Sequence, residues 1–263
     1  MLKEIKIYFK FIKMHILCGL EYKGWWMMCI QTAFAVITDP ISVVLMFSRF
    51  GGIGDWTMER ILLIYALAVT SFGLAETFCR GFDYFPWRMI QSGGFDRLLL
   101  RPRSLFTQVA ASFFHLHRLP RAITGLIVVI WTSSRLGVSF NFLNILVIIL
   151  ALLGGLLTYT GVFIMTSGIA FLTIKGLDWI YIFTNASYQV ARCPIDYMPK
   201  ILRGAFTFFM PMLVISYYPA SFICGWEEPA FTGFLALPAG FAFLGFSLII
   251  WQIGVRYYKS TGS

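Results

Sequence analysis

Charged residues are scarce in this chain of 263 residues. Only 13% of its positions are Asp, Glu, Lys or Arg, whereas about a quarter are charged in soluble domains. Apolar residues occupy 59% of the positions, and the mean hydropathy is +0.77. These values exclude an ordinary soluble domain and indicate an integral membrane protein.

Histidine is rare as well, and the cysteines are widely spaced. The only histidines are His15, His115 and His117, and the five cysteines form no CxxC pair or other metal-ligand spacing. The sequence therefore predicts no metal site. Cys193 and Cys224 could form a disulfide in an oxidising compartment, although buried free thiols are commoner in apolar surroundings.

The sequence signatures of common enzymes are missing. There is no GxxxxGK[ST] phosphate loop, no HExxH, no GxSxG and no dinucleotide-binding GxGxxG. The chain is therefore predicted not to hydrolyse ATP by itself. Its net charge of +9 could suggest nucleic acid, but the basic residues are dispersed among apolar segments, so no nucleic-acid partner is expected.

Long apolar runs predict an all-α integral membrane protein with six transmembrane helices, each near the length of about 20 residues that a spanning helix needs. The expected spans are 25–47, 61–79, a third ending at Ser134, 142–174, a fifth starting at Trp179, and 231–255. The third run is free of charge only back to Ala122. It is either short or carries Arg118 and Arg121 in its inner half, and the second interpretation is preferred.

Two further segments are expected to lie at the membrane without crossing it. In residues 1–24, lysines recur at helical spacing opposite apolar residues, which predicts an interfacial amphipathic helix on anionic inner-leaflet lipid. An ordinary basic tail is the alternative. Residues 192–225 contain four prolines and predict an outer re-entrant helical hairpin between spans five and six, tolerated only if protein buries it.

The basic residues also predict an orientation. Six spans place both termini on one side of the membrane, and if that side is cytoplasmic, 15 of the 21 Lys and Arg residues lie in inner segments and 6 in outer ones. The positive-inside rule therefore predicts cytoplasmic N- and C-termini.

Charges within the spans are costly and are usually paired or exposed to water. Glu76 lies at nearly the same depth in the second span as Arg118 and Arg121 in the third, so an ion pair between helices is geometrically plausible. The alternative is that all three side chains reach the inner headgroup layer. Asp39 lies near the middle of the first span, before Pro40. Either it has a role in function or assembly, or the helix is kinked there and water solvates the carboxylate locally.

The segment 79–113 is predicted to be a cytoplasmic loop that binds a partner. Three consecutive leucines, 98–100, offer a short helix one apolar side, and arginines including Arg97 and Arg101 surround them. Pro102 prevents this helix from continuing regularly into the third span. Attachment of the arginines to anionic lipid is the alternative.

Small residues recur in the fourth span. Gly154, Thr158 and Gly161 have a spacing that permits close helix approach, either within one subunit or between subunits.

The order of these features resembles the permease subunits of ABC-2-type exporters, and the resemblance covers nearly the whole chain. The closest local match is an inner-loop pattern of a bacterial branch, here Gly94, Asp96, Arg97, Leu98-Leu99-Leu100 and Arg101-Pro102. A second match is Cys193-Pro194, Met210-Pro211 and Tyr217-Tyr218-Pro219-Ala220, in which Cys193 departs from the usual aromatic residue.

The resemblance implies half of a transporter in the bacterial cell membrane. Such permeases form homo- or heterodimers with two copies of a separately encoded ATPase, which binds ATP and Mg, so this chain itself would hold no cofactor. The implied ATPase-coupling residues are Arg88, Gly94, Asp96, Arg97, Leu98, Leu99, Arg101 and Pro102. The implied exit gate is the outer hairpin, with Pro194, Pro211, Tyr218 and Pro219.

Two other classes stay open. A secondary transporter could use Asp39 and Glu76 for a coupling ion, although no internal repeat is visible. A membrane enzyme could use His115 and His117 with Glu76, although positions two apart on a helix point to different faces. The many aromatic residues suit a route for an amphiphile as well as lipid belts and cores, so they do not identify a substrate.

Overall fold

The computed structural model describes residues 2–21, 23–50, 56–173, 178–192, 198–226 and 229–258. Its longer helices are α1 (Leu2–Glu21), α2 (Trp25–Phe50), α3 (Met58–Phe85), α6 (Leu119–Arg135), α7 (Phe142–Ala170), α8 (Asp178–Val190), α10 (Met212–Cys224) and α11 (Ala236–Tyr257). Shorter helical segments are η1 (Pro86–Gln91), α4 (Phe95–Leu99), α5 (Leu105–Ser112), η2 (Leu116–Arg118), α9 (Lys200–Gly204), η4 (Ala205–Phe209) and η5 (Ala230–Phe234). The predicted all-α class is confirmed.

Four to six stretches of the described residues could cross a membrane by their length and composition. Four are single stretches: Trp25–Arg49, Met58–Gln91, Phe142–Ala170 and Ala236–Tyr257. Two are bent pairs: Leu105–Ser112 with Leu116–Arg135, at 59°, and Lys200–Phe209 with Met212–Cys224, at 96°. A broken span and a re-entrant loop would both show such a bend, so the outer re-entrant hairpin stays a prediction.

The predicted boundaries of three spans can be compared with the helices. The fifth span was expected from Trp179 onward, but α8 has 13 residues and is about 20 Å long, which is too short to cross a bilayer alone. The helix of the second span does not end at Cys79, because α3 and η1 continue to Gln91. Helical structure expected for the third span includes Arg118 and Arg121, since η2 and α6 are continuous from Leu116 to Arg135, and the depth of these arginines in the membrane stays a prediction.

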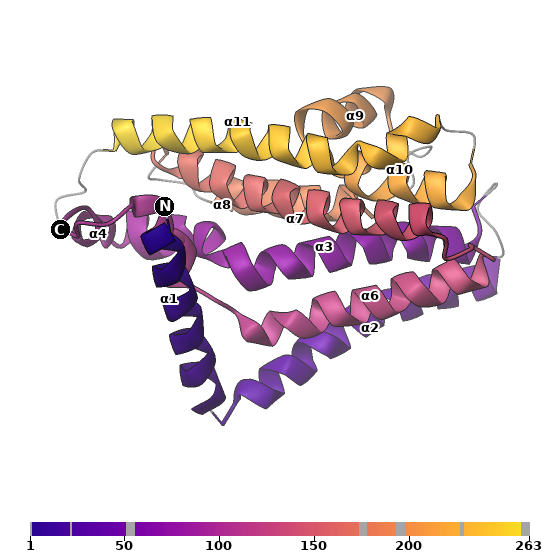
Figure 1. Ribbon diagram of the computed structural model, residues 1–263, viewed down its shortest axis with the longest axis horizontal. Coiled ribbons are helices and arrows are strands. Elements are labelled where there is room, and N and C mark those ends of the chain that lie inside the picture. Colours follow the sequence, from indigo (N-terminus) through magenta and orange to yellow (C-terminus); the bar gives the residue numbers. More distant parts are fainter. Residues whose placement is uncertain are drawn as a thin grey trace.

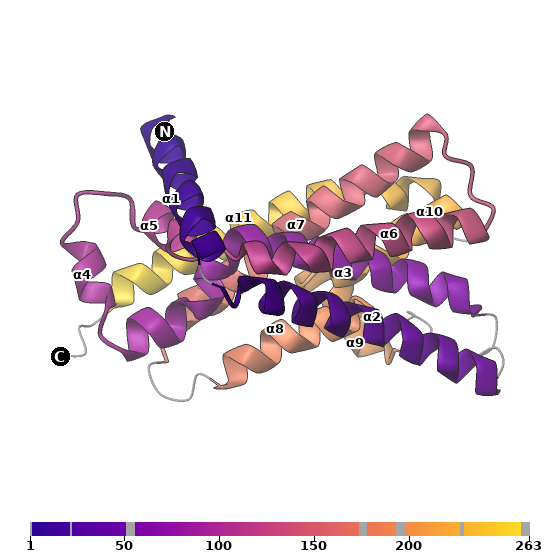
Figure 2. The same ribbon diagram turned by 90° about the horizontal axis from the view of Figure 1, so that it is seen from below.

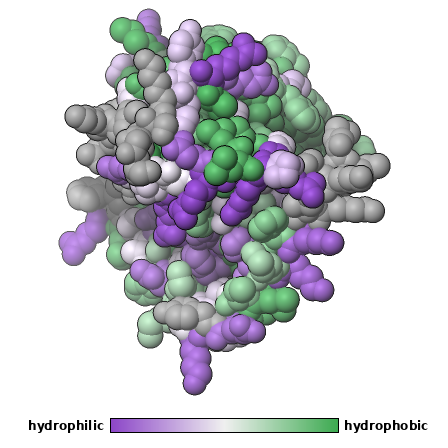
Figure 3. All heavy atoms as spheres, turned by 90° about the vertical axis from the view of Figure 1, so that its left-hand side faces the viewer, coloured by the Kyte–Doolittle hydropathy of each residue, from purple (hydrophilic) through white to green (hydrophobic). Residues whose placement is uncertain are grey.

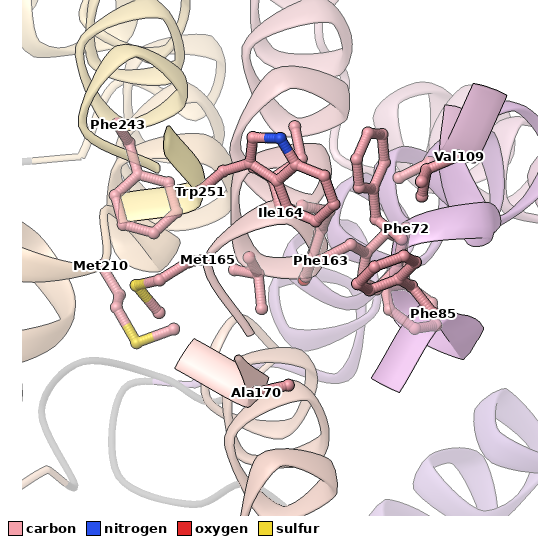
Figure 4. Close-up of a cluster of buried hydrophobic side chains, with 14 of the residues drawn as sticks. Phe72, Phe85, Val109, Phe163, Ile164, Met165, Ala170, Met210, Phe243 and Trp251 are labelled. Atoms are coloured by element: carbon pink, nitrogen blue, oxygen red, sulfur yellow. The ribbon is translucent and has the colours of Figure 1, made fainter. Parts of the chain in front are cut away.

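Helix α3 lies at the centre of the bundle and contacts α6 on one side and α7 on the other, while α11 covers α7 (Figure 1). Figure 4 shows where the aromatic and aliphatic side chains of these helices meet. The Trp251 ring of α11 packs edge to face on Phe82 of α3, at 5.3 Å between centroids, and on Phe85, at 5.1 Å. Burial of these large side chains holds α11 to the bundle.

Glycines bring α7 and α11 into backbone contact. A Cβ atom at Gly154 would lie 2.2 Å from the carbonyl oxygen of Ala236, and one at Gly254 would lie 2.3 Å from that of Gly168. No side chain fits at these distances. Gly161 likewise faces the ring of Phe243, at 2.7 Å. Of the two interpretations of the small-residue spacing, the structure therefore supports packing within one chain.

The start of α1 and the end of α11 lie at the same end of the bundle, together with α4 and α5 (Figures 1 and 2). There α1 runs at a steep angle to the long helices. Its Tyr8 hydroxyl donates a hydrogen bond to the carbonyl oxygen of Phe78, at 2.9 Å, and burial raises the pKa of this hydroxyl above its ordinary value. Within residues 1–24, a helix is present over Leu2–Glu21. Its position on the lipid surface stays a prediction.

Candidate functional site

A buried group of charges, termed here the arginine cluster, lies between α3 and the start of α6. It consists of Glu76, Arg80, Asp83, Arg118 and Arg121. Glu76 Oε2 is 2.5 Å from Nη1 of Arg121, and Glu76 Oε1 accepts a hydrogen bond from Arg80. Nη1 of Arg118 is 4.0 Å from Glu76 Oε1. The predicted ion pair between the second and third spans is therefore present, and only 2% of the Glu76 side chain is exposed.

Two members of the arginine cluster were not predicted. Arg80 Nε lies 3.1 Å from Asp83 Oδ2, and the Thr184 hydroxyl of α8 donates to the other Asp83 oxygen, at 3.4 Å. The spacing of Glu76, Arg80 and Asp83 places all three on one face of a helix, so the sequence contained the signal. The predicted span 61–79 stops just before Arg80 and so leaves Arg80 and Asp83 out. Ion pairing lets the helix continue.

A second charged contact, termed here the clasp, joins α2 to the end of α8. It consists of Asp39, Arg192, Tyr65 and Tyr188. Arg192 Nη1 lies 2.6 Å from Asp39 Oδ2, and the Tyr65 hydroxyl of α3 donates to the same oxygen at 3.3 Å. The Arg192 guanidinium lies over the ring of Tyr188, at 4.3 Å, and over that of Tyr65, at 5.3 Å.

The partner of Asp39 comes from a segment far along the chain. Arg192, at the start of the predicted outer hairpin, has a side chain that is 16% exposed and lies against Asp39 of α2. The two residues are 153 positions apart, and no local pattern links them. Pairing with Arg192 shows that Asp39 is not simply a solvated kink.

Tyr188 connects the clasp with the arginine cluster. Its ring lies between two guanidinium groups, that of Arg192 and, at 5.9 Å, that of Arg121. The same ring packs on Phe72 of α3, with centroids 4.4 Å apart. Polar and aromatic contacts of Thr184 and Tyr188 therefore hold the second half of α8 against α3.

The inner loop forms an ordered element around α4. Phe95 and Leu98 are buried in the core of the bundle, and the Tyr258 hydroxyl donates to Asp96 Oδ1 at 3.0 Å. Gly93 precedes the helix with a φ of +69°, so the glycine required by the backbone is this one rather than the neighbouring Gly94. These contacts attach α4 to the ends of α3, α7 and α11.

The three leucines of the inner loop do not share one surface. Leu98 faces inward, whereas the exposed fractions of Leu99 and Leu100 are 48% and 85%. Arg97, Arg101 and Pro102 are exposed beside them, and the Arg88 guanidinium lies over the Phe113 ring at 5.0 Å. The end-on view in Figure 3 shows hydrophilic residues with apolar groups between them on this end of the molecule. Of the leucines predicted to contact the ATPase, Leu99 is exposed and could bind a partner, whereas Leu98 is buried.

The predicted outer hairpin is described only in part. Pro194 and Cys193 lie outside the described residues, and Cys224 is a free thiol. Pro211 and Tyr218 line an apolar groove of about 780 Å³ between η4, α10, η5 and α11. Pro219 lies within α10 and is buried. None of the four residues of the clasp lines this groove.

The histidines lie closer together than expected. The rings of His115 and His117 are 5.1 Å apart, because His115 precedes η2 in a non-helical conformation rather than sharing a helix with His117. Among the described residues, no group of three or more His, Cys, Asp or Glu side chains could hold a metal ion.

Comparison with known families places this arrangement in a wider context. Residues 33–262 match the model of a family described as ABC-2 family transporter protein. The match includes the arginine cluster, the clasp and α4. Neither a curated protein nor a solved structure shows a match to the chain.

Proposed function

Since the chain belongs to the ABC-2 family of transporter proteins, we propose that this transport membrane subunit works in an ATP-driven exporter. It forms the translocation pathway with a second permease subunit, identical or related. A separately encoded pair of ATPase subunits binds ATP and Mg, because this chain has no phosphate loop. The protein is a multi-pass component of the bacterial cell membrane with both termini in the cytoplasm.

The observation that carries this proposal is the construction of α4. Phe95, Leu98 and Asp96 attach the helix to the bundle, so a force applied to α4 reaches α3, α7 and α11. Leu99 and Leu100 lie outside, with Arg97 and Arg101 beside them. An apolar anchor with a charged rim suits a protein groove, since buried apolar groups supply affinity and rim charges supply orientation.

The charges inside the bundle support the same conclusion over a secondary transporter. Glu76 pairs with arginines of the arginine cluster, and Asp39 pairs with Arg192. A coupling metal cation needs several oxygen ligands, whereas each of these two residues offers a single carboxylate beside a guanidinium group.

We test the proposal by recovery of the ATPase. Leu99→Asp should lower the amount of a phosphate-loop ATPase that co-purifies with the tagged chain by at least about tenfold, because a charge replaces an apolar anchor at the interface. Arg101→Ala should lower it less. The measurement is ATP hydrolysis and mass spectrometry of the eluted complex.

The matched control is Leu143→Asp. The exposed fraction of Leu143 is 51%, similar to the 48% of Leu99. Leu143 lies in the first turn of α7, where a negative charge stabilises the helix. This variant should retain the ATPase. If Leu99→Asp elutes as a folded protein with its full complement of ATPase, α4 is not the coupling element and the proposal fails.

A further inference from the structure

We propose that Asp39, Tyr65 and Tyr188 form a recognition site for an organic cation, which the guanidinium of Arg192 occupies in this structure. This inference rests on the proposed function, because it names a class of compound that the transporter would carry. Three helices supply the site, since Asp39 lies in α2, Tyr65 in α3 and Tyr188 in α8.

The contacts of Arg192 are those that a bound cation would make. Its guanidinium has a carboxylate oxygen at 2.6 Å and two aromatic rings at 4.3 and 5.3 Å. The Tyr65 hydroxyl donates to that same oxygen, at 3.3 Å, and so orients the carboxylate. The carbonyl oxygen of Val36, at 3.2 Å, is a second acceptor within reach of this single O–H group and keeps the hydroxyl at this place.

This chemistry selects the class of ligand. Aromatic faces attract a cation through the negative potential over the ring, and a carboxylate adds its full charge. A guanidinium or quaternary ammonium compound gains from both. A metal cation gains little, because it needs several oxygen ligands and the site presents one carboxylate. An anion would be repelled by Asp39.

Exposure distinguishes this site from the arginine cluster. The Arg121 guanidinium also lies over aromatic rings and beside a carboxylate, but Glu76 is almost completely buried and also accepts from Arg80. By contrast, 47% of the Asp39 side chain is exposed with Arg192 in place. The described chain therefore leaves the carboxylate of Asp39 uncovered on one side, and a ligand would approach it from that side of the first predicted span.

Arg192 has a second partner beside the site. Its Nη2 donates to the side-chain oxygen of Gln189, one turn earlier. A ligand that takes the place of the guanidinium exchanges one cation for another, so the charge of the site is unchanged. When the Arg192 side chain returns to the site, it displaces the ligand. The arginine therefore acts as a competitor within the same chain.

The test is direct binding to the purified chain in nanodiscs, with radiolabelled methylguanidinium as the probe and without ATP or ATPase. Arg192→Ala should bind the probe at least about tenfold more tightly than the natural chain, because the internal occupant is gone. Adding Asp39→Asn should abolish this gain. Adding Tyr188→Leu instead should weaken binding roughly 2- to 30-fold, the range expected for one cation–aromatic contact.

Two controls exclude a general effect of charge. Arg135→Ala removes a guanidinium that lies over the Trp131 ring, at 5.7 Å, and should leave the affinity unchanged. Methylurea has a similar shape without the charge and should not compete with the probe. If Arg192→Ala does not fold, Arg192→Gln provides the same vacancy with a neutral side chain.

Two results would overturn the site: no gain in affinity when Arg192 is replaced in a folded variant, or a gain that survives Asp39→Asn. Either result leaves the ATPase interaction of α4 untouched. Conversely, Leu99→Asp should bind methylguanidinium as the natural chain does, so the failure of one proposal can be distinguished from that of the other.

Discussion

The carboxylates of Glu76 and Asp39 both interrupt apolar helices, but their surroundings differ. Glu76 is buried and faces Arg121 and Arg80 at hydrogen-bonding distance, with Arg118 at 4.0 Å. Asp39 is half exposed and has one guanidinium partner, Arg192, and one tyrosine hydroxyl. The first is enclosed by protein charges, whereas the second is accessible.

This difference indicates what each carboxylate contributes. Removing a buried charge leaves its partners without a counter-charge in a region of low polarity, so it lowers the free energy of unfolding. Removing a half-exposed charge costs less stability, because a single partner can move to a new position. The arginine cluster is accordingly interpreted as structural support for α3 and α6, and the clasp as a contact that can open.

The largest expected effect is that of Glu76→Gln. It should lower the unfolding free energy by about 3–5 kcal/mol, because Arg118 and Arg121 then lack a counter-charge and Arg80 keeps only Asp83. Thermal unfolding in detergent should show a fall in Tm of roughly 6–12 °C or more. The same chemical change at Glu59, in the first turn of α3, serves as the control and should have a much smaller effect. Equal stability of the natural chain and Glu76→Gln would remove the structural interpretation.

Asp39→Asn should have an intermediate effect on stability. Its carboxylate has one guanidinium partner, whereas Glu76 has several, so the loss should be smaller than that of Glu76→Gln, at about 1–3 kcal/mol. The same thermal unfolding assay checks this value. A fall as large as that of Glu76→Gln would show that the clasp is as essential to folding as the arginine cluster, and the contrast between the two would disappear.

Tyr188→Phe should have the smallest effect. The substitution keeps the ring between Arg121 and Arg192 and removes only the hydroxyl, which accepts from Arg192 at 3.4 Å. The change in Tm should be within about 2 °C, since a long hydrogen bond contributes little beyond the ring contacts. Tyr188→Leu, which removes the ring face, should lower Tm further. Identical Tm values for the two variants would mean that the ring faces do not hold the guanidinium groups.

Part of the candidate site could be predicted from the sequence. The depth of Glu76 along one helix and of Arg121 along another predicted their ion pair, because helical rise converts sequence position into depth. The same reasoning could not find Arg192 as the partner of Asp39. Arg192 follows α8 and meets Asp39 of α2 only through the tertiary packing of these two segments, which lie 153 positions apart.

By itself, the sequence determined the membrane class, the all-helical fold, most helix positions and the family resemblance. These follow from hydropathy and spacing within windows of about 20 residues, where each residue acts nearly independently of distant ones. The tertiary structure alone decided that Leu98 turns inward while Leu99 and Leu100 stay outside, and that the glycines of α7 pack on α11. It also decided that Arg192 meets Asp39 between two tyrosine rings. Such contacts depend on how helices far apart in the chain rotate and approach each other, and no local pattern of residues specifies that rotation.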